Sequence, residues 1–203
     1  MELQLWEAVY NGDLEEARRL LKNPTIDVNW RNHLETSVYK DSSPLYHTFG
    51  RTEEAFIISK MLLAHPDIDV NVKTASGDTP FLGGLRGENE LTIQEFLKDA
   101  RVDINARDNE GRSPMFWVGR IGYSKVQFMI ASGREWVFGE PGDELTDPLV
   151  QARQWRYEKV ISILESYQKN PDDAVRLVRE ELGISGKRFS FWPLGFLTSC
   201  SGD

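Results

Sequence analysis

Histidine and cysteine, two residue types that often carry out catalysis or bind metals, are scarce in this chain. Its 203 residues include three histidines, His33, His47 and His65, and a single cysteine, Cys200. A zinc site needs cysteines and histidines at short, paired spacings, and no such spacing is present. Cys200 has no neighbouring base that would activate its thiol as a nucleophile. We therefore expect no catalytic residue, no metal site and no enzymatic activity of the chain itself.

The sequence also lacks a motif that would bind phosphate groups. The nearest glycine-rich stretch is residues 83–87, with the sequence GGLRG. A phosphate loop needs a longer pattern that ends in Gly-Lys-Ser/Thr, and a dinucleotide-binding turn needs Gly-x-Gly-x-x-Gly after a strand. The stretch matches neither pattern and falls where a helix is expected, so we expect no cofactor.

Recognition chemistry is better represented than catalytic chemistry. Arginine and tryptophan are enriched among the residues that dominate binding energy at protein interfaces. Three arginines, Arg51, Arg86 and Arg120, recur at nearly regular intervals, and two tryptophans, Trp117 and Trp155, follow a similar spacing. Whether these side chains share one surface depends on the elements that carry them.

Two markers recur along the chain with nearly the same period. A Ser/Thr-Pro pattern stands at residues 43–45 (SPL), 79–81 (TPF) and 113–115 (SPM), with a variant at 146–149 (TDPL), so its prolines are almost evenly spaced. A second pattern, IDVN or VDIN, ends at Asn29, Asn71 and Asn105, and the interval between the last two equals that between the second and third prolines. Two markers in phase indicate an internal repeat of about 34 residues.

Each period predicts a pair of helices. Ser or Thr before proline favours a helix start, because proline in the first turn loses only an N–H that has no partner there. A second stretch in each period then places apolar residues three and four positions apart, which puts them on one side of a helix. Examples of this apolar face are Ile58, Met61 and Leu62, then Ile93, Phe96 and Leu97, then Val126, Met129 and Ile130.

These patterns resemble the ankyrin repeat family. Residues 108–114 (DNEGRSP), followed by Gly122 and Val126, are similar to the family's turn, its Thr-Pro-Leu-His motif and its two helices. The resemblance covers about residues 3–167 and implies an all-α solenoid of stacked helix-turn-helix units joined by short turns and finger loops. The family's histidine is absent, its place being taken by Tyr46, Leu82, Phe116 and Val150. The glycine pair of residues 83–84 is expected to loosen its helix by roughly 1 kcal/mol per glycine.

The expected organisation is one array followed by a tail. The array spans residues 1–183, with approximate repeats at 1–29, 30–71, 72–105, 106–138 and 139–169 and a capping helix at 171–182. A cap is needed because the last repeat cannot bury its apolar face alone. The apolar tail, residues 184–203, is expected to fold back on the last repeat; the alternatives are a docking segment or a surface anchor.

The first finger loop is longer than the others. The stretch of chain from Asn29 to Pro44 exceeds the later stretches from Asn71 to Pro80 and from Asn105 to Pro114, which are equal in length. The extra residues bring Trp30, His33 and Tyr39 into this finger, where they form a candidate specificity element. The alternative is a neutral insertion, since longer surface loops cost little stability.

Aligning the repeats on their prolines places six further residues along one concave groove: His47, Arg51, Arg86, Trp117, Arg120 and Trp155. Such a strip suits an acidic or aromatic peptide, because arginine forms forked hydrogen bonds with carboxylates. The alternative is that the arginines pair with acidic residues of adjacent helices and the tryptophans fill gaps between repeats. The resemblance also implies Asn29, Asn71 and Asn105 as possible sites of asparagine hydroxylation, besides a structural role.

The composition of the chain indicates which classes of partner and which cellular compartment to expect. The formal net charge of −8 and the pI near 5.0 argue against binding to nucleic acid, which needs a positive surface. No run reaches the roughly 20 apolar residues of a membrane span, and the single cysteine suits a reducing compartment. We expect a monomer in the cytoplasm, with the nucleus as an alternative.

The functional prediction is a protein–protein interaction module or scaffold. It would bind a partner through the concave groove and the long first finger. The alternative function is a substrate-recruiting subunit of an enzyme complex in which catalysis takes place elsewhere. In both cases the partner is a protein or a peptide segment.

Overall fold

The protein is all-helical over the residues that its structure describes. The computed structural model describes residues 1–34, 39–87, 89–118, 122–144 and 146–184, and within these ranges there is no strand. This confirms the all-α prediction. The elements are α1 (Glu2–Asn11), α2 (Leu14–Leu20), η1 (a 3₁₀ helix, Pro44–His47), α3 (Glu53–Leu63), α4 (Pro80–Arg86), α5 (Glu90–Lys98), α6 (Pro114–Val118), α7 (Tyr123–Ala131), α8 (Pro148–Gln154), α9 (Glu158–Lys169) and α10 (Pro171–Glu181).

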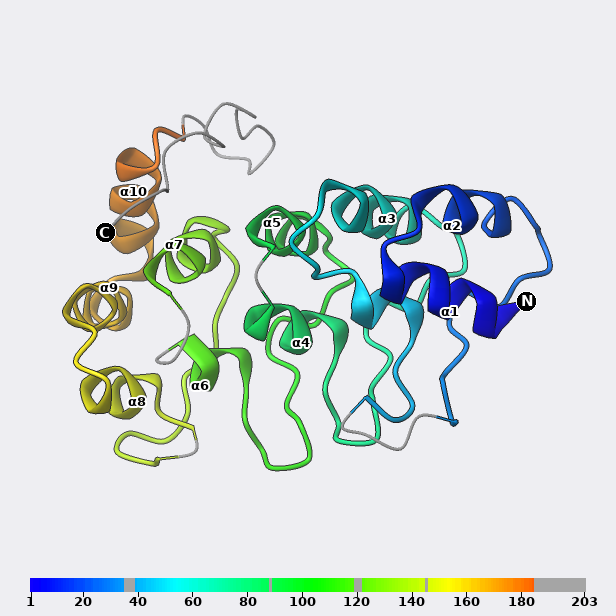
Figure 1. The fold of residues 1–203 in the computed structure, drawn as a ribbon. Helices are drawn as coiled ribbons and strands as arrows, with labels where there is room; N and C mark the ends of the chain where they lie inside the picture. Colours follow the sequence, from blue (N-terminus) through cyan, green and yellow to red (C-terminus); the bar gives the residue numbers. More distant parts are fainter. Residues whose placement is uncertain (35–38, 88, 119–121, 145, 185–203) are drawn as a thin grey trace.

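The helices form two rows that run the length of the molecule (Figure 1). One row follows the contacts α1 to η1, η1 to α4, α4 to α6 and α6 to α8. The other follows α2 to α3, α3 to α5, α5 to α7 and α7 to α9. Contacts also join α1 to α2, α4 to α5 and α8 to α9 across the rows. The chain therefore alternates between the rows as it advances along the molecule.

Side-chain caps and prolines set where many of these helices begin. Thr79 and Asp147 each precede a proline, and their side chains accept a hydrogen bond from the backbone N–H of Leu82 and Leu149 respectively. Thr52 accepts in the same way at the start of α3. Each cap satisfies an N–H that has no partner within its helix, which fixes the helix start.

The core lies between the two rows. Its fully buried side chains include Ile58, Phe81, Phe96 and Met129, each contributed by a different helix. Because both rows contribute buried residues along their length, the core extends as a continuous strip through the molecule. None of the described helices is both long enough and apolar enough to cross a membrane.

The glycine pair in α4 makes room for the preceding aromatic residues. A Cβ atom on Gly83 would lie 2.7 Å from Cε2 of the Tyr46 ring, and one on Gly84 would overlap the ring of Phe49. The expected loosening of this helix considered only helix propensity. In the structure the missing side chains allow η1 and Phe49 to pack closely against α4, so the pair contributes to packing.

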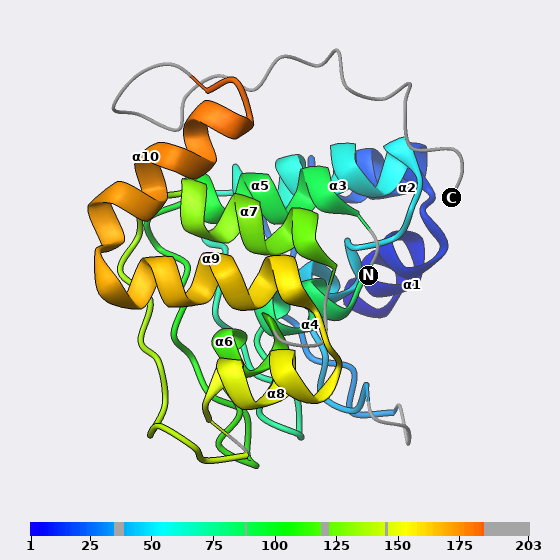
Figure 2. The same cartoon turned by 90° about the vertical axis from the view of Figure 1, so that its left-hand side faces the viewer.

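The loops that join the rows gather on one side of the molecule (Figure 2). Neighbouring loop tips share backbone hydrogen bonds: Ala75 donates to the Lys40 carbonyl at 2.9 Å, and Asn109 donates to the Ser76 carbonyl at 3.0 Å. Gly77 and Gly111 occupy equivalent places in these tips, and both have a φ of 82°. Only glycine adopts this backbone conformation at little cost, which explains its recurrence there.

The last helix, α10, packs on the end of one row, against α7 and α9. Asn170 caps α10 by accepting a hydrogen bond from the Asp173 N–H, and Gly183 follows its end with a left-handed φ of 67°. Ala174 and Val178 are buried against α7 and α9, while Leu177 on the opposite face is 49% exposed. The apolar stripe of α10 thus covers core residues that would otherwise meet water.

Candidate interaction surface

Four aromatic rings surround His47 at the start of the molecule. The ring centroids of Trp6, Tyr10, Tyr39 and Tyr46 lie 4.6, 5.3, 5.5 and 5.4 Å from that of the imidazole, all at steep interplanar angles near 70°. These five residues, called the aromatic cluster below, come from α1, the first finger and η1. Edge-to-face packing of this kind is favourable for aromatic rings. The cluster therefore holds Tyr39 of the first finger against η1.

The inner part of the cluster is anchored by hydrogen bonds. The Trp6 Nε1–H donates to the Ser42 carbonyl at 3.1 Å, and the Ser42 Oγ lies 2.8 Å from the His47 Nε2. The Trp6 side chain also stacks in parallel on Tyr10, with 5.1 Å between centroids. The rings that reach the surface are thus held in place by buried groups.

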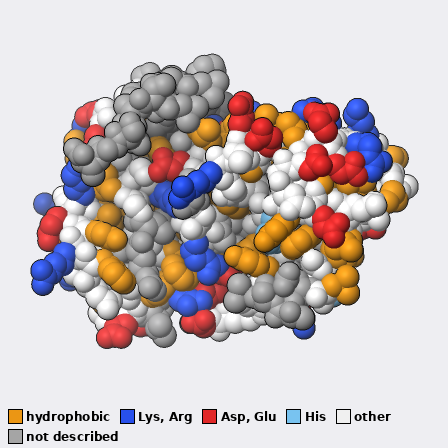
Figure 3. Space-filling model, in the orientation of Figure 1, with side chains coloured by type: hydrophobic (Ala, Val, Ile, Leu, Met, Phe, Trp, Pro, Cys, Tyr) orange, Lys and Arg blue, Asp and Glu red, His pale blue; other side chains and the backbone are white. Residues whose placement is uncertain are grey.

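The outer rings of the cluster are open to solvent. Tyr10 is 55% exposed and Tyr39 is 41% exposed, whereas Trp6 and Tyr46 are buried. Figure 3 shows hydrophobic side chains gathered beside a histidine over η1, between α1 and α4. Rigid aromatic surface of this kind is typical of protein interfaces, because it offers contact area at low entropic cost.

Arg86 lies next to the aromatic cluster and is already paired. Its guanidinium forms an ion pair with Asp78, and it also donates to the Tyr46 hydroxyl at 3.4 Å. Burial lowers the pKa of Arg86, but the hydrogen bond and charge of Asp78 outweigh this and raise it. Burial, together with the nearby Asp78 charge, raises the pKa of Tyr46 to about 12. Arg86 is therefore paired with an acid, as in the alternative interpretation of the sequence, but this acid lies in the loop before its own helix α4 and not on an adjacent helix.

Trp117 extends this surface along the row of helices. The guanidinium carbons of Arg86 and Arg112 lie 4.9 and 5.0 Å from its ring centroid. Arg112 is itself bonded to the buried Asp108 at 2.7 Å. Both cations near the indole therefore have a carboxylate of their own, and this part of the surface carries little net positive charge.

The remaining predicted residues lie in three places. Trp30 and His33 pack edge to face in the first finger, 6.5 Å apart, and His33 bonds to Asp41 at 2.5 Å. Arg51 is exposed in the segment before α3, and Trp155 is 49% exposed at the carboxyl end of α8. Arg120 lies outside the described residues. Of the predicted set, the structure brings together Tyr39, His47, Arg86 and Trp117.

The three asparagines form one recurring arrangement. Each side chain donates its Nδ2–H to a carbonyl and accepts an N–H of the loop before the next pair of helices. The donated bonds are Asn29 to Asp67 at 2.7 Å, Asn71 to Arg101 at 2.8 Å and Asn105 to Glu135 at 3.0 Å. The accepted bonds come from Asp69 at 2.8 Å, Asp103 at 2.8 Å and Val137 at 2.9 Å. Both ends of every amide are therefore engaged in joining successive segments.

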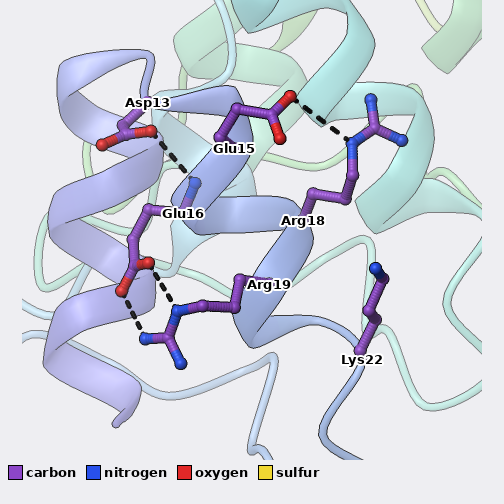
Figure 4. A pocket seen from close by; sticks show the side chains of 6 residues that line it. All are labelled: Asp13, Glu15, Glu16, Arg18, Arg19 and Lys22. Atoms are coloured by element: carbon purple, nitrogen blue, oxygen red, sulfur yellow. Dashed lines mark hydrogen bonds and ion pairs between the residues drawn. The ribbon is translucent and has the colours of Figure 1, made fainter.

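The hollow beside α2, in the described part of the chain, is lined by charged side chains that pair with one another. The hollow in Figure 4 is lined by side chains from α2 and its flanks: Asp13, Glu15, Glu16, Arg18, Arg19 and Lys22. Within it Arg19 pairs with Glu16 at 2.6 Å and Arg18 with Glu15 at 3.9 Å, as expected for a solvated helix face. No group of three or more histidine, cysteine or acidic side chains in the described ranges is placed to hold a metal.

No protein-family model matches this chain, and no curated protein sequence is similar enough to be counted as a relative. The resemblance to the ankyrin family therefore depends on the residues and geometry of this chain alone.

Two parts of the surface were missing from the predicted set. Trp6 and Tyr46 contribute rings to the aromatic cluster, and Arg112 contributes the second cation beside Trp117. Arg112 and Asp78 each stand directly before a Ser/Thr-Pro pair, so alignment on the prolines would have identified both. Trp6 carried no such signal, because its role depends on the fold of the first finger.

Proposed function

We propose that the chain is a divergent ankyrin-type repeat array that binds a protein partner through the aromatic cluster and the adjoining Trp117 surface. The single observation that carries the proposal is the exposed pair Tyr10 and Tyr39, whose rings pack edge to face against His47. Fold alone does not define a function, so the site carries the argument.

The repeat interpretation is supported by the side-chain bonds of the three asparagines. The same residue type makes the same pair of hydrogen bonds at three successive places, and the two later ones, Asn71 and Asn105, are one full period apart in the sequence. The shared loop-tip bonds and the two rows of helices agree with stacked units that mainly contact their neighbours.

The chemistry of the surface favours an apolar or aromatic anchor on the partner. Asp78 and Asp108 balance the charges of Arg86 and Arg112, so these arginines offer a flat stacking surface more than a site for a free carboxylate. Tyr10 and Tyr39 add exposed rings with hydroxyl groups. A partner segment with an aromatic or aliphatic side chain would bury these rings.

The test compares capture of partners by the intact chain and by a Tyr10→Ser, Tyr39→Ser double variant. The double variant removes exposed rings and leaves the buried core intact, so it is expected to fold while losing the partner. An Arg86→Ala variant would be less informative, because it leaves the buried Asp78 carboxylate without its cation.

A matched control uses two apolar side chains of similar exposure elsewhere. Val137 is 50% exposed and Leu177 is 49% exposed, so a Val137→Ser, Leu177→Ser variant removes a comparable apolar area. The proposal requires loss of the same partner from the tyrosine variant but not from this control. Equal recovery from all three proteins would show that the aromatic cluster is not the binding surface.

A further inference from the structure

The turn between α8 and α9 holds a non-glycine residue in a left-handed conformation. Arg156 has a φ of 56°, and the backbone N–H of the next residue, Tyr157, donates to the Ala152 carbonyl at 3.0 Å. Residues with a side chain adopt this region at a cost, because Cβ approaches the following carbonyl. Where such a cost persists, function is one reason for it.

The turn between α1 and α2 has glycine at the position that corresponds to Arg156. Gly12 follows α1 with a φ of 70°, and Asp13 donates to the Ala8 carbonyl at 2.8 Å. The hydrogen-bond pattern is the same as around Arg156, which donates to the Arg153 carbonyl at 3.1 Å. Arginine thus stands in the α8–α9 turn at a place where glycine would fit without strain.

This turn also exposes two aromatic side chains beside the arginine. Trp155 is 49% exposed and Tyr157 is 41% exposed, although tryptophan and tyrosine gain much by burial. Basic and hydrophobic side chains lie side by side over α8 and α9 in Figure 3. Tryptophan, tyrosine and arginine are also the residue types most enriched at binding hot spots.

The charges around the turn leave one cation for a partner. Arg153 pairs with Glu165 at 2.9 Å, and the Lys159 Nζ lies 5.5 Å from the centroid of the Tyr123 ring. Within the described ranges Arg156 forms no ion pair, and Glu158 is the acidic residue that follows it in sequence. The turn and its surroundings have a local excess of one positive charge, since there are three cations (Arg153, Arg156 and Lys159) and two anions (Glu158 and Glu165). The whole chain has a net charge of −8.

We propose that Trp155, Arg156 and Tyr157 form a second docking point, which binds a peptide segment of a partner protein carrying a carboxylate next to an apolar side chain. Arg156 would bind the carboxylate, and the two rings would cover the apolar side chain. Burial of the rings and pairing of the guanidinium would offset the backbone strain held in the free protein. This inference goes beyond the proposed function, because it concerns a different surface and a partner of different charge.

The experiment selects short linear peptides from a displayed library on the intact protein. The enriched peptides are expected to combine Asp or Glu with a neighbouring aromatic or aliphatic residue. The Kd of one such peptide is then measured by fluorescence anisotropy against the intact protein and against Arg156→Gly. We expect the loss of the charge-assisted bond to weaken binding at least about tenfold.

Thermal unfolding separates a binding role from a structural one. Arg156→Gly relieves the left-handed strain, so its Tm is expected to rise by about 2–4 °C. A variant that is more stable and yet binds more weakly has lost a contact, not its fold. Arg18→Gly on α2 is the matched control for removal of an exposed arginine, and it is expected to leave the Kd unchanged.

Several outcomes would overturn the inference: no enriched peptide, enrichment of Lys- or Arg-rich peptides, or an unchanged Kd for Arg156→Gly. Concentration-dependent dimerisation of the intact protein that Arg156→Gly abolishes would assign the turn to a second copy instead. The Tyr10→Ser, Tyr39→Ser variant should bind the selected peptide normally. The two docking surfaces can therefore fail independently.

Discussion

At the scale of single residues, the asparagines show how a short side chain can connect two distant stretches of backbone. An amide carries a donor and an acceptor, and in Asn71 both point to the loop between α5 and α6. A hydroxylase acting on Asn71 would first have to break both bonds. The predicted modification of Asn29, Asn71 and Asn105 therefore remains a hypothesis that requires local unfolding.

Replacement of Asn71 by alanine is expected to lower the free energy of unfolding by about 1–2 kcal/mol, because two backbone groups lose their partner. Urea denaturation of both proteins would measure the difference. Asn11→Ala is the control, since the Asn11 side chain makes no hydrogen bond within the described residues and is exposed. Equal effects of the two substitutions would show that the Asn71 bonds contribute nothing.

Tyr46 predicts a specific alkaline response. Its folded pKa of about 12 exceeds the ordinary value of 10.0, so the unfolded state releases the proton first as pH rises. The stabilisation is complete below about pH 10 and is lost between about pH 10 and pH 12, up to roughly 2–3 kcal/mol.

Tyr46→Phe removes this titration. Its urea midpoint is therefore expected to fall less steeply over this alkaline range than that of the intact protein. Tyr10→Phe is the control for removal of a tyrosine hydroxyl from the same cluster. A parallel fall of the midpoint in all three proteins would assign the alkaline loss to other groups.

The residue types of the surface could be predicted from the sequence, but their pairing could not. Spacing placed His47, Arg86 and Trp117 on one side of successive units. The ion pair of Arg86 depends on Asp78, a residue that the alignment on prolines picks out but whose side-chain direction is set by the conformation of the loop before α4. The sequence therefore suggested a strip of unpaired arginines, whereas in the structure Asp78 neutralises the charge of Arg86.

At the scale of elements, η1 and α4 pack more closely than ordinary side chains would allow. Gly84→Ala provides a test in which two effects have opposite signs. Helix propensity alone predicts a gain of about 1 kcal/mol. Overlap of the new methyl group with the Phe49 ring predicts a loss of about 1–3 kcal/mol, and we expect the loss to dominate.

Two further variants identify the cause of that loss. Gly50→Ala adds the same methyl group where its nearest neighbour, the Ala55 Cβ, is at an ordinary 3.4 Å, so a change within about 0.5 kcal/mol is expected. Adding Phe49→Ala to Gly84→Ala should recover part of the loss relative to Phe49→Ala alone. A stabilised Gly84→Ala protein would contradict the close packing.

Helix starts were largely accessible from the sequence, whereas helix type and packing distance were not. The Ser/Thr-Pro pattern locates the starts of η1, α4 and α6. The same pattern gives a single 3₁₀ turn in η1 and an α-helix in α4, because the chain after Pro44 must fit Tyr46 and Phe49 against the next helix. Such a constraint comes from packing against the neighbouring helix, so it cannot be recognised from the few residues around the Ser/Thr-Pro pattern.

At the scale of the whole molecule, α10 determines whether the end of the core is covered. Val178→Asp would bury a charge against α7 and α9, and we expect it to reduce stability by about 3 kcal/mol or more. Exposure of the end of the core should also cause self-association, which light scattering after gel filtration would detect. Leu177→Asp, on the exposed face, is expected to leave both properties unchanged.

The two rows of helices have a mechanical consequence. The main contacts of each described helix are with its neighbours, so the first and last helices are connected only through those between them. A pulling force between the ends would act on one interface at a time, and each asparagine bridge would have to break before the next segment separates. Such a chain would lengthen in steps under load and could keep one docking surface intact while the other is already unravelled.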